Sequence, residues 1–259
     1  GHLYHNQLEL MWLARKTPEV RNIYEMVTKA NPSTSSWGAT SETMQEIAPC
    51  VFNVRELSSD VETRIIECER KHGKGLLVLG DSHAIDLFGV IASREERSFL
   101  IGVTQGSCRP HTNHSYCHYD RVLEFINENT DTFELVIYEQ AGFYLLRENN
   151  GAKGSRGMFS SLGITEPVAN IVVDEEHIRL SAEYLQQVSE VVNVNWFLPR
   201  AEPHISQTTI LRNDCDFKYL YRPNLYETFT ELDHFIEVVI NAYSNDRLNT
   251  VSQNEMFQF

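Results

Sequence analysis

The sequence has little positive charge for its length. Its 259 residues carry 22 Lys and Arg against 36 Asp and Glu, a formal net charge of −14. A protein that wraps nucleic acid needs clustered cations to meet the phosphates, so nucleic acid is not an expected partner. A bare anionic membrane surface would also repel a chain of this charge.

Long hydrophobic runs are absent as well. No stretch approaches the roughly 18 to 20 apolar residues that a membrane-spanning helix requires, and the longest, such as 76–79 and 135–138, have the length of strands. The N-terminus, Gly1-His2-Leu3-Tyr4-His5, lacks the basic and apolar regions of a signal peptide, and Gly1-His2 is consistent with a tag remnant. We therefore expect a soluble piece of a longer protein, with any targeting element outside it.

Cysteine is scarce, with five residues in the chain. Cys50 and Cys68 are 18 positions apart, Cys108 and Cys117 are nine apart, and Cys215 stands alone. Because no CxxC pair occurs, the spacing does not indicate a zinc site, and no metal is expected. In an oxidising compartment the economical interpretation is two local disulfides and one unpaired cysteine. Five reduced, buried thiols are the alternative.

An alternation of strand and helix patterns predicts the fold class. Short apolar runs typical of buried parallel strands occur at 76–79, 99–103, 133–138, 191–198 and from 248 towards 259. Helical patterns occur at 58–71, 84–91, 121–129, 175–190 and 229–243. This alternation predicts an α/β fold, a three-layer α/β/α sandwich with a mainly parallel sheet, over residues 46–259. Residues 1–45 are expected to form an N-terminal helical extension or linker.

A serine lies where such a fold binds its ligands. The apolar run 76–79 is followed by Gly80-Asp81-Ser82-His83 and then by a helix. Ligands collect at the carboxyl ends of parallel strands, and a hydroxyl near a helix N-terminus has backbone N–H groups beside it for a developing oxyanion. Ser82 is therefore a candidate nucleophile. Because Asp and Ser are common helix caps, a turn followed by a cap is the alternative.

The residues around Ser82 resemble those of a known family. The segment 77–84, LVLGDSHA, is similar to the GDSHA block of the SGNH (GDSL-like) hydrolases, in the version fused to membrane acyltransferase-3 proteins. Residues 106–110, GSCRP, with Cys117 downstream resemble the glycine loop of that family and its Cys-Pro element. Residues 196–203 resemble its strand that ends in a Pro-rich turn, and the cysteines ahead of the first strand also fit. The resemblance covers roughly residues 45–259.

The resemblance implies a serine esterase or O-acyltransferase with a flavodoxin-like α/β/α sandwich. Ser82 would attack an acyl donor, form an acyl-enzyme, and pass the acyl group to a sugar hydroxyl or to water. The backbone N–H groups of Ser82 and Gly106 would form the oxyanion hole. The Gly-x-Asn-Asp segment of the family is replaced by YEQAG at 138–142. In this segment the amide of Gln140 is the substitute oxyanion donor, or it only fixes a loop.

The catalytic base that the resemblance implies is missing from its usual place. Family members carry Asp-x-x-His near the C-terminus, where the His activates the serine and the Asp orients the His. The match here, Asp174-Glu175-Glu176-His177, comes early and precedes a helix, so Asp174 is expected to cap that helix and the pair is a weak base candidate. Our hypothesis is that the sandwich lacks its C-terminal end, and that residues beyond Phe259 carry the Asp-His pair and a partner for Cys215.

The resemblance thus predicts the catalytic domain of a bacterial acyltransferase-3/SGNH fusion, a membrane protein with this domain on the periplasmic face of the inner membrane. The domain would transfer an acetyl group to a sugar hydroxyl of a surface polysaccharide such as lipopolysaccharide O-antigen. Because the acyltransferase-3 membrane domain would deliver the acetyl group, no soluble cofactor is expected. A carbohydrate acetyl esterase is one alternative, and a catalytically silent glycan-binding or scaffolding module is the other.

Overall fold

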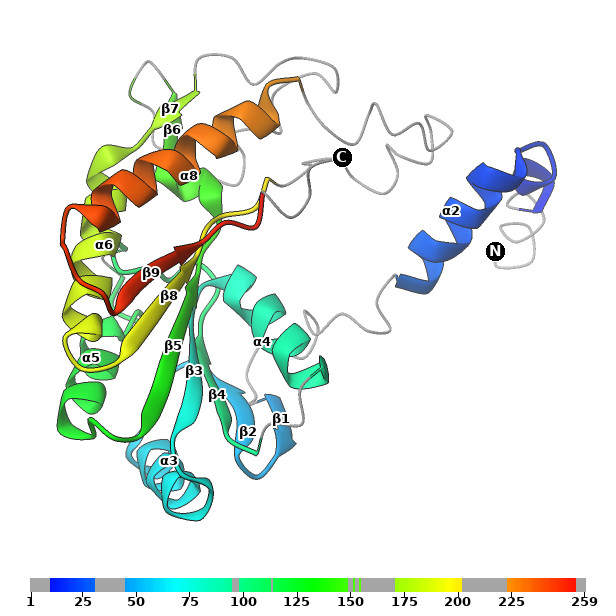
Figure 1. The fold of residues 1–259 in the computed structure, drawn as a ribbon. Coiled ribbons are helices and arrows are strands. Elements are labelled where there is room, and N and C mark those ends of the chain that lie inside the picture. Colours follow the sequence, from blue (N-terminus) through cyan, green and yellow to red (C-terminus); the bar gives the residue numbers. More distant parts are fainter. Residues whose placement is uncertain are drawn as a thin grey trace.

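A mostly parallel sheet with helices packed against it forms the centre of the molecule (Figure 1). The computed structural model describes residues 10–30, 45–94, 98–112, 114–148, 151, 154, 171–201 and 223–254. The strands of this sheet are β1 (Gln45–Ala48), β2 (Val51–Val54), β3 (Gly75–Gly80), β4 (Leu100–Thr104), β5 (Phe133–Glu139), β8 (Asn193–Phe197) and β9 (Leu248–Val251). The helices are α2 (Pro18–Ala30), α3 (Ser59–His72), α4 (Ser82–Arg94), α5 (Tyr119–Glu128), the 3-10 turn η2 (Gly142–Leu145), α6 (Glu175–Ser189) and α8 (Leu225–Asn241). A separate antiparallel pair consists of β6 (Leu146–Glu148) and β7 (Ile171–Val173).

The strand order in the large sheet is β1-β2-β4-β3-β5-β8-β9. β1 runs antiparallel to β2, and the other neighbouring pairs are parallel. The predicted α/β class with a mainly parallel sheet is therefore confirmed. From β3 the chain moves outward to β4 and then returns across β3 to β5, so the direction of winding reverses between β3 and β5. Ligands of open α/β sheets bind outside the carboxyl ends of the strands at such a switch point.

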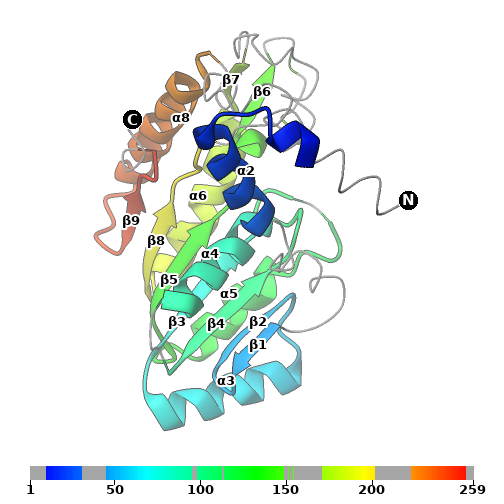
Figure 2. The ribbon, with the colours of Figure 1, turned by 90° about the vertical axis from the view of Figure 1, so that its right-hand side faces the viewer.

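β3 is buried on both faces. Leu77 and Leu79 belong to a cluster that α3, α5, α6 and α8 complete, whereas Leu76 and Val78 belong to a second cluster. Within the described ranges, α4 supplies all the helical members of this second cluster. Figure 1 shows α5, α6 and α8 on one side of the sheet and α4 on the other, and Figure 2 looks onto the α4 side. Burial on both faces explains the uninterrupted apolar run, and the arrangement is compatible with three layers.

Several elements differ from those that the sequence predicts. The short strands β1, β2, β6 and β7 were not predicted. The last strand, β9, ends at Val251, earlier than the predicted run towards 259. α2 lies in the N-terminal region where a helical extension is expected. No helix within the described residues is both long and apolar enough to cross a membrane.

Both predicted disulfides are present. Cys50 is bonded to Cys68, and Cys108 is bonded to Cys117. The first joins the start of β2 to α3, and the second closes the loop between β4 and α5. The alternative of reduced thiols is therefore wrong for these four residues. Cys215 lies outside the described residues.

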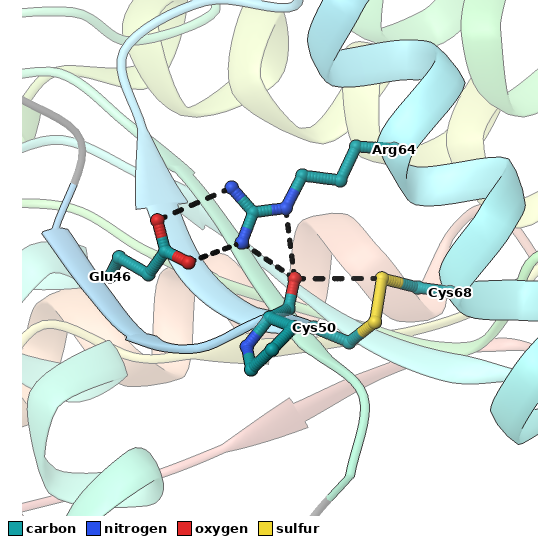
Figure 3. The surroundings of a disulfide bond; sticks show 5 residues. Glu46, Cys50, Arg64 and Cys68 are labelled. Atoms are coloured by element: carbon teal, nitrogen blue, oxygen red, sulfur yellow. Dashed lines mark hydrogen bonds and ion pairs between the residues drawn. A yellow bond between two sulfur atoms is a disulfide. The ribbon is translucent and has the colours of Figure 1, made fainter.

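Hydrogen bonds and an ion pair made by Arg64 lie beside the first disulfide (Figure 3). The carbonyl oxygen of Pro49 accepts hydrogen bonds from Nε and Nη2 of Arg64 at 2.8 and 2.6 Å. Nη2 of Arg64 also pairs with Oε1 of Glu46 at 2.8 Å. The turn between β1 and β2 is thus fixed to α3 by a covalent bond and by the guanidinium.

Candidate active site

The turn after β3 requires a glycine. Gly80 has a φ of +144°, a backbone conformation that residues with a side chain rarely adopt. A Cβ at this position would also overlap the carbonyl oxygen of Glu139 in β5. The absence of a side chain therefore lets the ends of β3 and β5 approach each other closely, at the switch point of the sheet.

Asp81 caps α4 and bridges the switch point. Its carboxylate accepts hydrogen bonds from the backbone N–H of His83 at 3.0 Å and from the backbone N–H of Ala141, just after β5, at 3.1 Å. The first of these is the bond of an N-cap residue. Because Asp81 supplies the cap, Ser82 becomes the first residue of α4, and its hydroxyl is not used for capping.

A buried arginine, Arg109, forms an ion pair with the carboxylate of Asp81. Nη1 of Arg109 lies 3.0 Å from Oδ2 of Asp81, and Nη2 donates to the carbonyl oxygen of Ser107 at 3.0 Å. The guanidinium carbon lies 3.4 Å from the centre of the Tyr144 ring. Arg109 follows Cys108 directly, so the second disulfide loop is joined to the turn before Ser82. Arg109 belongs to the segment 106–110 that resembles the family, but the sequence alone predicts no role for its side chain.

The structure brings Ser82 and Gly106 to the same edge of the sheet. Gly106 lies in a turn after β4 that is closed by a hydrogen bond of 3.0 Å from the N–H of Cys108 to the carbonyl oxygen of Gln105. The N–H of Gln105 donates to the carbonyl oxygen of Gly80 at 3.1 Å, which attaches this turn to the end of β3. Ser82 is half-buried, and its hydroxyl forms no hydrogen bond with any residue that the structure describes.

Gln140 follows β5, as the sequence predicts, but it lies inside the protein. The residue is fully buried, and its Oε1 accepts a hydrogen bond from the hydroxyl of Tyr138. Nε2 has no hydrogen-bond partner among the described residues. The amide is therefore held through its oxygen, and its N–H groups are the part left for another partner.

Asp174 and His177 contact each other at the start of α6. Oδ1 of Asp174 accepts from the backbone N–H of His177 at 3.3 Å, so the expected capping of α6 is confirmed. Nδ1 of His177 lies 3.0 Å from the carbonyl oxygen of Tyr144 in η2. Its ring stacks on that of His111, with 4.2 Å between the ring centres. These contacts connect α6 to η2 and to the second disulfide loop, and neither Asp174 nor His177 is hydrogen-bonded to the hydroxyl of Ser82.

A group of charged and polar side chains that the sequence did not reveal lies at the same edge of the sheet. Glu139, the last residue of β5, is fully buried. Its Oε1 accepts from Nε2 of Gln253, just after β9, at 2.9 Å, and lies 3.9 Å from Nη1 of Arg200, just after β8. Nη2 of Arg200 also lies 3.4 Å from Oδ2 of Asp86 in α4. We call these four residues the Glu139 cluster.

Burial controls ionisation in this part of the molecule. It raises the pKa of Glu139 from its ordinary value of 4.5 to about 7, although Arg200 and the hydrogen bond from Gln253 oppose this rise. Burial also raises the pKa of Asp86, again against the charge of Arg200. His83, beside Ser82, shows the opposite effect, because burial lowers its pKa to about 4 and so keeps the imidazole neutral near pH 7. The described ranges contain no group of three His, Cys, Asp or Glu that could hold a metal ion.

Comparison with known proteins adds no assignment to this geometry. No family model and no curated protein matches the chain. The SGNH resemblance therefore rests on the residues that carry it, chiefly the GDSHA block at 80–84.

Proposed function

We propose that the chain is a serine-dependent acyl-transfer domain in which Ser82 forms an acyl-enzyme. The observation that carries this proposal is the position of Ser82, the first residue of α4 at the switch point between β3 and β5. The buried carboxylate of Asp81 fixes the start of the helix, so the Ser82 hydroxyl is free to react. The positive end of the α4 dipole lies at Ser82, and together with the N–H of Ser82 it would favour the negative charge of a tetrahedral intermediate.

The turn at 105–108 supplies a second side of the site. The N–H of Gly106 is our second oxyanion donor, because the turn is attached to the end of β3 by the Gln105–Gly80 hydrogen bond. Space around Gly106 is open, since nothing described lies within 4 Å of where a Cβ would be. An acyl group could therefore reach this turn from solvent.

The acceptor, donor and location in this proposal follow the family resemblance. The acceptor is a sugar hydroxyl of a bacterial surface polysaccharide such as lipopolysaccharide O-antigen, and the donor acetyl group comes from an acyltransferase-3 membrane domain of the same protein. The site would face the periplasm. The two disulfides support an oxidising compartment.

A catalytically silent module is the second candidate. It is favoured by one observation, that no described side chain forms a hydrogen bond with the Ser82 hydroxyl, whereas an activated serine needs a base nearby. An acetyl esterase uses the same acyl-enzyme as the transferase, so the two differ only in the nucleophile that attacks it.

Covalent labelling separates these candidates. We would incubate the chain with a fluorophosphonate and measure its intact mass, alongside Ser82→Ala and the matched control Ser93→Ala on the exposed side of the same helix. An adduct in the unchanged chain and in Ser93→Ala, but not in Ser82→Ala, supports the acyl-transfer proposal. Equal labelling of Ser82→Ala, or no labelling of any chain, favours the silent module. Incubation with p-nitrophenyl acetate and an oligosaccharide then distinguishes transfer, which yields acetylated sugar, from release of acetate.

A further inference from the structure

Glu139 lies next to the turn that carries Ser82. In the register of the sheet, Glu139 pairs with Gly80, two residues before Ser82, and the two backbones meet with no room for a Cβ. Tyr138 packs against Trp196 in the cluster on the α5, α6 and α8 side. Because successive side chains of a strand point to opposite faces, the side chain of Glu139 lies on the face that α4 covers.

A chain of contacts links the carboxyl group of Glu139 to the same side of α4 as Ser82. Arg200 lies between Glu139 and Asp86, with distances of 3.9 and 3.4 Å to their oxygens. Asp86 is four residues after Ser82, so the two side chains are neighbours on one face of the helix. The Glu139 cluster and Ser82 are therefore gathered on one side of the helix N-terminus.

The two carboxyl oxygens of Glu139 differ in their hydrogen bonding. Oε1 accepts from Gln253, whose Nε2 also donates to the carbonyl oxygen of Leu198 at 2.9 Å and is thereby fixed in direction. Oε2 has no hydrogen-bond partner among the described residues, although Glu139 is 0% exposed. A buried carboxyl oxygen without a partner is costly in free energy, and such exceptions call for an explanation. A role as proton acceptor for the Ser82 hydroxyl, on the same side of the α4 N-terminus, would explain this oxygen.

We propose that Glu139 is the base of this site and accepts the proton that leaves Ser82, an inference that rests on the proposed function. As the Ser82 O–H bond breaks, Oγ bonds to the acyl carbonyl carbon and the proton moves to Oε2 of Glu139. The bond from that carbon to the leaving alkoxide then breaks, and the alkoxide takes the proton. In the second half, the acceptor hydroxyl gives its proton to Glu139 and attacks the acyl carbon, and Ser82 leaves and recovers the proton.

The charges around Glu139 suit both halves of this cycle. A general acid–base group works best when its pKa is near the working pH, and burial brings the pKa of Glu139 to about 7. Arg200 and Gln253 favour the ionised form, whereas Asp81 and Asp86 oppose it. The carboxyl group can thus be ionised to receive a proton and protonated to return it.

The pH dependence of fluorophosphonate labelling tests the inference. In the unchanged chain, the labelling rate at Ser82 should rise as pH passes through about 7, because the base must be ionised. Glu139→Gln should lower the labelling rate by about 100-fold or more. It should also abolish the rise of the rate near pH 7, which we call the pH limb. The matched control is Asp131→Asn, which neutralises a carboxyl group that is exposed and paired with Lys74, and it should keep both the rate and the limb.

A second variant keeps the test decisive if Glu139→Gln does not fold. Gln253→Met removes the donor to Oε1 but no charge, so the pH at which the labelling rate rises should move to a higher value. Labelling of Glu139→Gln at an unchanged rate, a limb unmoved by Gln253→Met, or a limb near pH 4 where His83 titrates would each overturn the role of Glu139 while Ser82 remains the nucleophile. No Ser82-dependent labelling at any pH would overturn the proposed function together with it.

Discussion

Arg109 and Asp81 form an ion pair with 3.0 Å between Nη1 and Oδ2, although their side chains are only 4% and 1% exposed. A buried ion pair gives up the hydration of both groups, so its geometry must be well satisfied. Here Asp81 also receives backbone N–H groups from both sides of the switch point, and the guanidinium lies on the ring of Tyr144. The pair therefore joins the second disulfide loop, η2 and the start of α4 around Ser82.

Removing the positive partner should be strongly destabilising. We expect Arg109→Met to lower the free energy of unfolding by about 3–5 kcal/mol, because the buried charge of Asp81 would lose its only described cationic partner. Urea denaturation at pH 7 measures the change. The control is Lys74→Met, which breaks an exposed pair with Asp131 and should lower the free energy of unfolding much less, because solvent screens that pair. Equal losses in the two variants would show that the buried pair contributes no more than a surface pair.

The glycine at the end of β3 gives a second prediction. Gly80→Ala should lower the free energy of unfolding by about 3 kcal/mol or more, because the φ of +144° is strained for alanine and the Cβ would overlap the backbone of β5. Gly89→Ala is the matched control on α4, where a Cβ meets nothing within 4 Å. Gly89→Ala should raise the free energy of unfolding by about 0.5–1 kcal/mol, because alanine has a higher helix propensity than glycine. Similar values of one sign for both variants would contradict the close approach of β3 and β5.

The two disulfides should differ in what they support. By loop length, replacing Cys50 and Cys68 with serine should cost about 3 kcal/mol, and replacing Cys108 and Cys117 about 2.5 kcal/mol. Only the second loop carries Arg109, so only its loss should also slow fluorophosphonate labelling of Ser82. Denaturation and labelling of the two double variants provide the comparison. Equal effects on labelling would mean that the second loop does not position the site.

Local patterns made part of this structure predictable from sequence. The apolar run of β3 and the helix after Ser82 are encoded within a few residues, and so is the cap at Asp174, whose partner is three residues away. The short strands β1 and β2 have only four residues each, and their pairing is set by contacts with distant parts of the chain. Such strands carry too little pattern to be recognised.

The Glu139 cluster could not be predicted for a related reason. Its hydrogen bond to Gln253 joins residues 114 positions apart, and Arg200 reaches Asp86 over the same separation. In the sequence, Glu139 is an ordinary acidic residue at the end of a strand. Its burial and its raised pKa arise only when β5, β8 and β9 end side by side. The sequence predicts that these strands form a sheet, but it does not predict which side chains meet at their ends.

Burial of Glu139 predicts a pH dependence of stability that does not require enzymatic activity. The folded protein raises the pKa of this carboxyl group from 4.5 to about 7, so the folded state binds the proton more tightly than the unfolded state. The contribution of Glu139 to stability is therefore complete below pH 4.5 and is lost as pH rises to 7. The loss amounts to about 3 kcal/mol, at 1.36 kcal/mol per pKa unit.

Glu139→Gln cannot ionise, so it should lack this loss. The free energy of unfolding of Glu139→Gln, relative to that of the unchanged chain, should increase by about 3 kcal/mol between pH 4 and pH 8, so the variant becomes relatively more stable. Asp131→Asn should show no such trend across this window, because the hydrogen bond and charge of Lys74 lower the pKa of Asp131 and place its effect at more acidic pH. Denaturation curves of the three chains at several pH values give these differences. A difference between Glu139→Gln and the unchanged chain that stays constant with pH would mean that the Glu139 carboxyl group titrates alike in the folded and unfolded states, and burial would then not be what sets its ionisation.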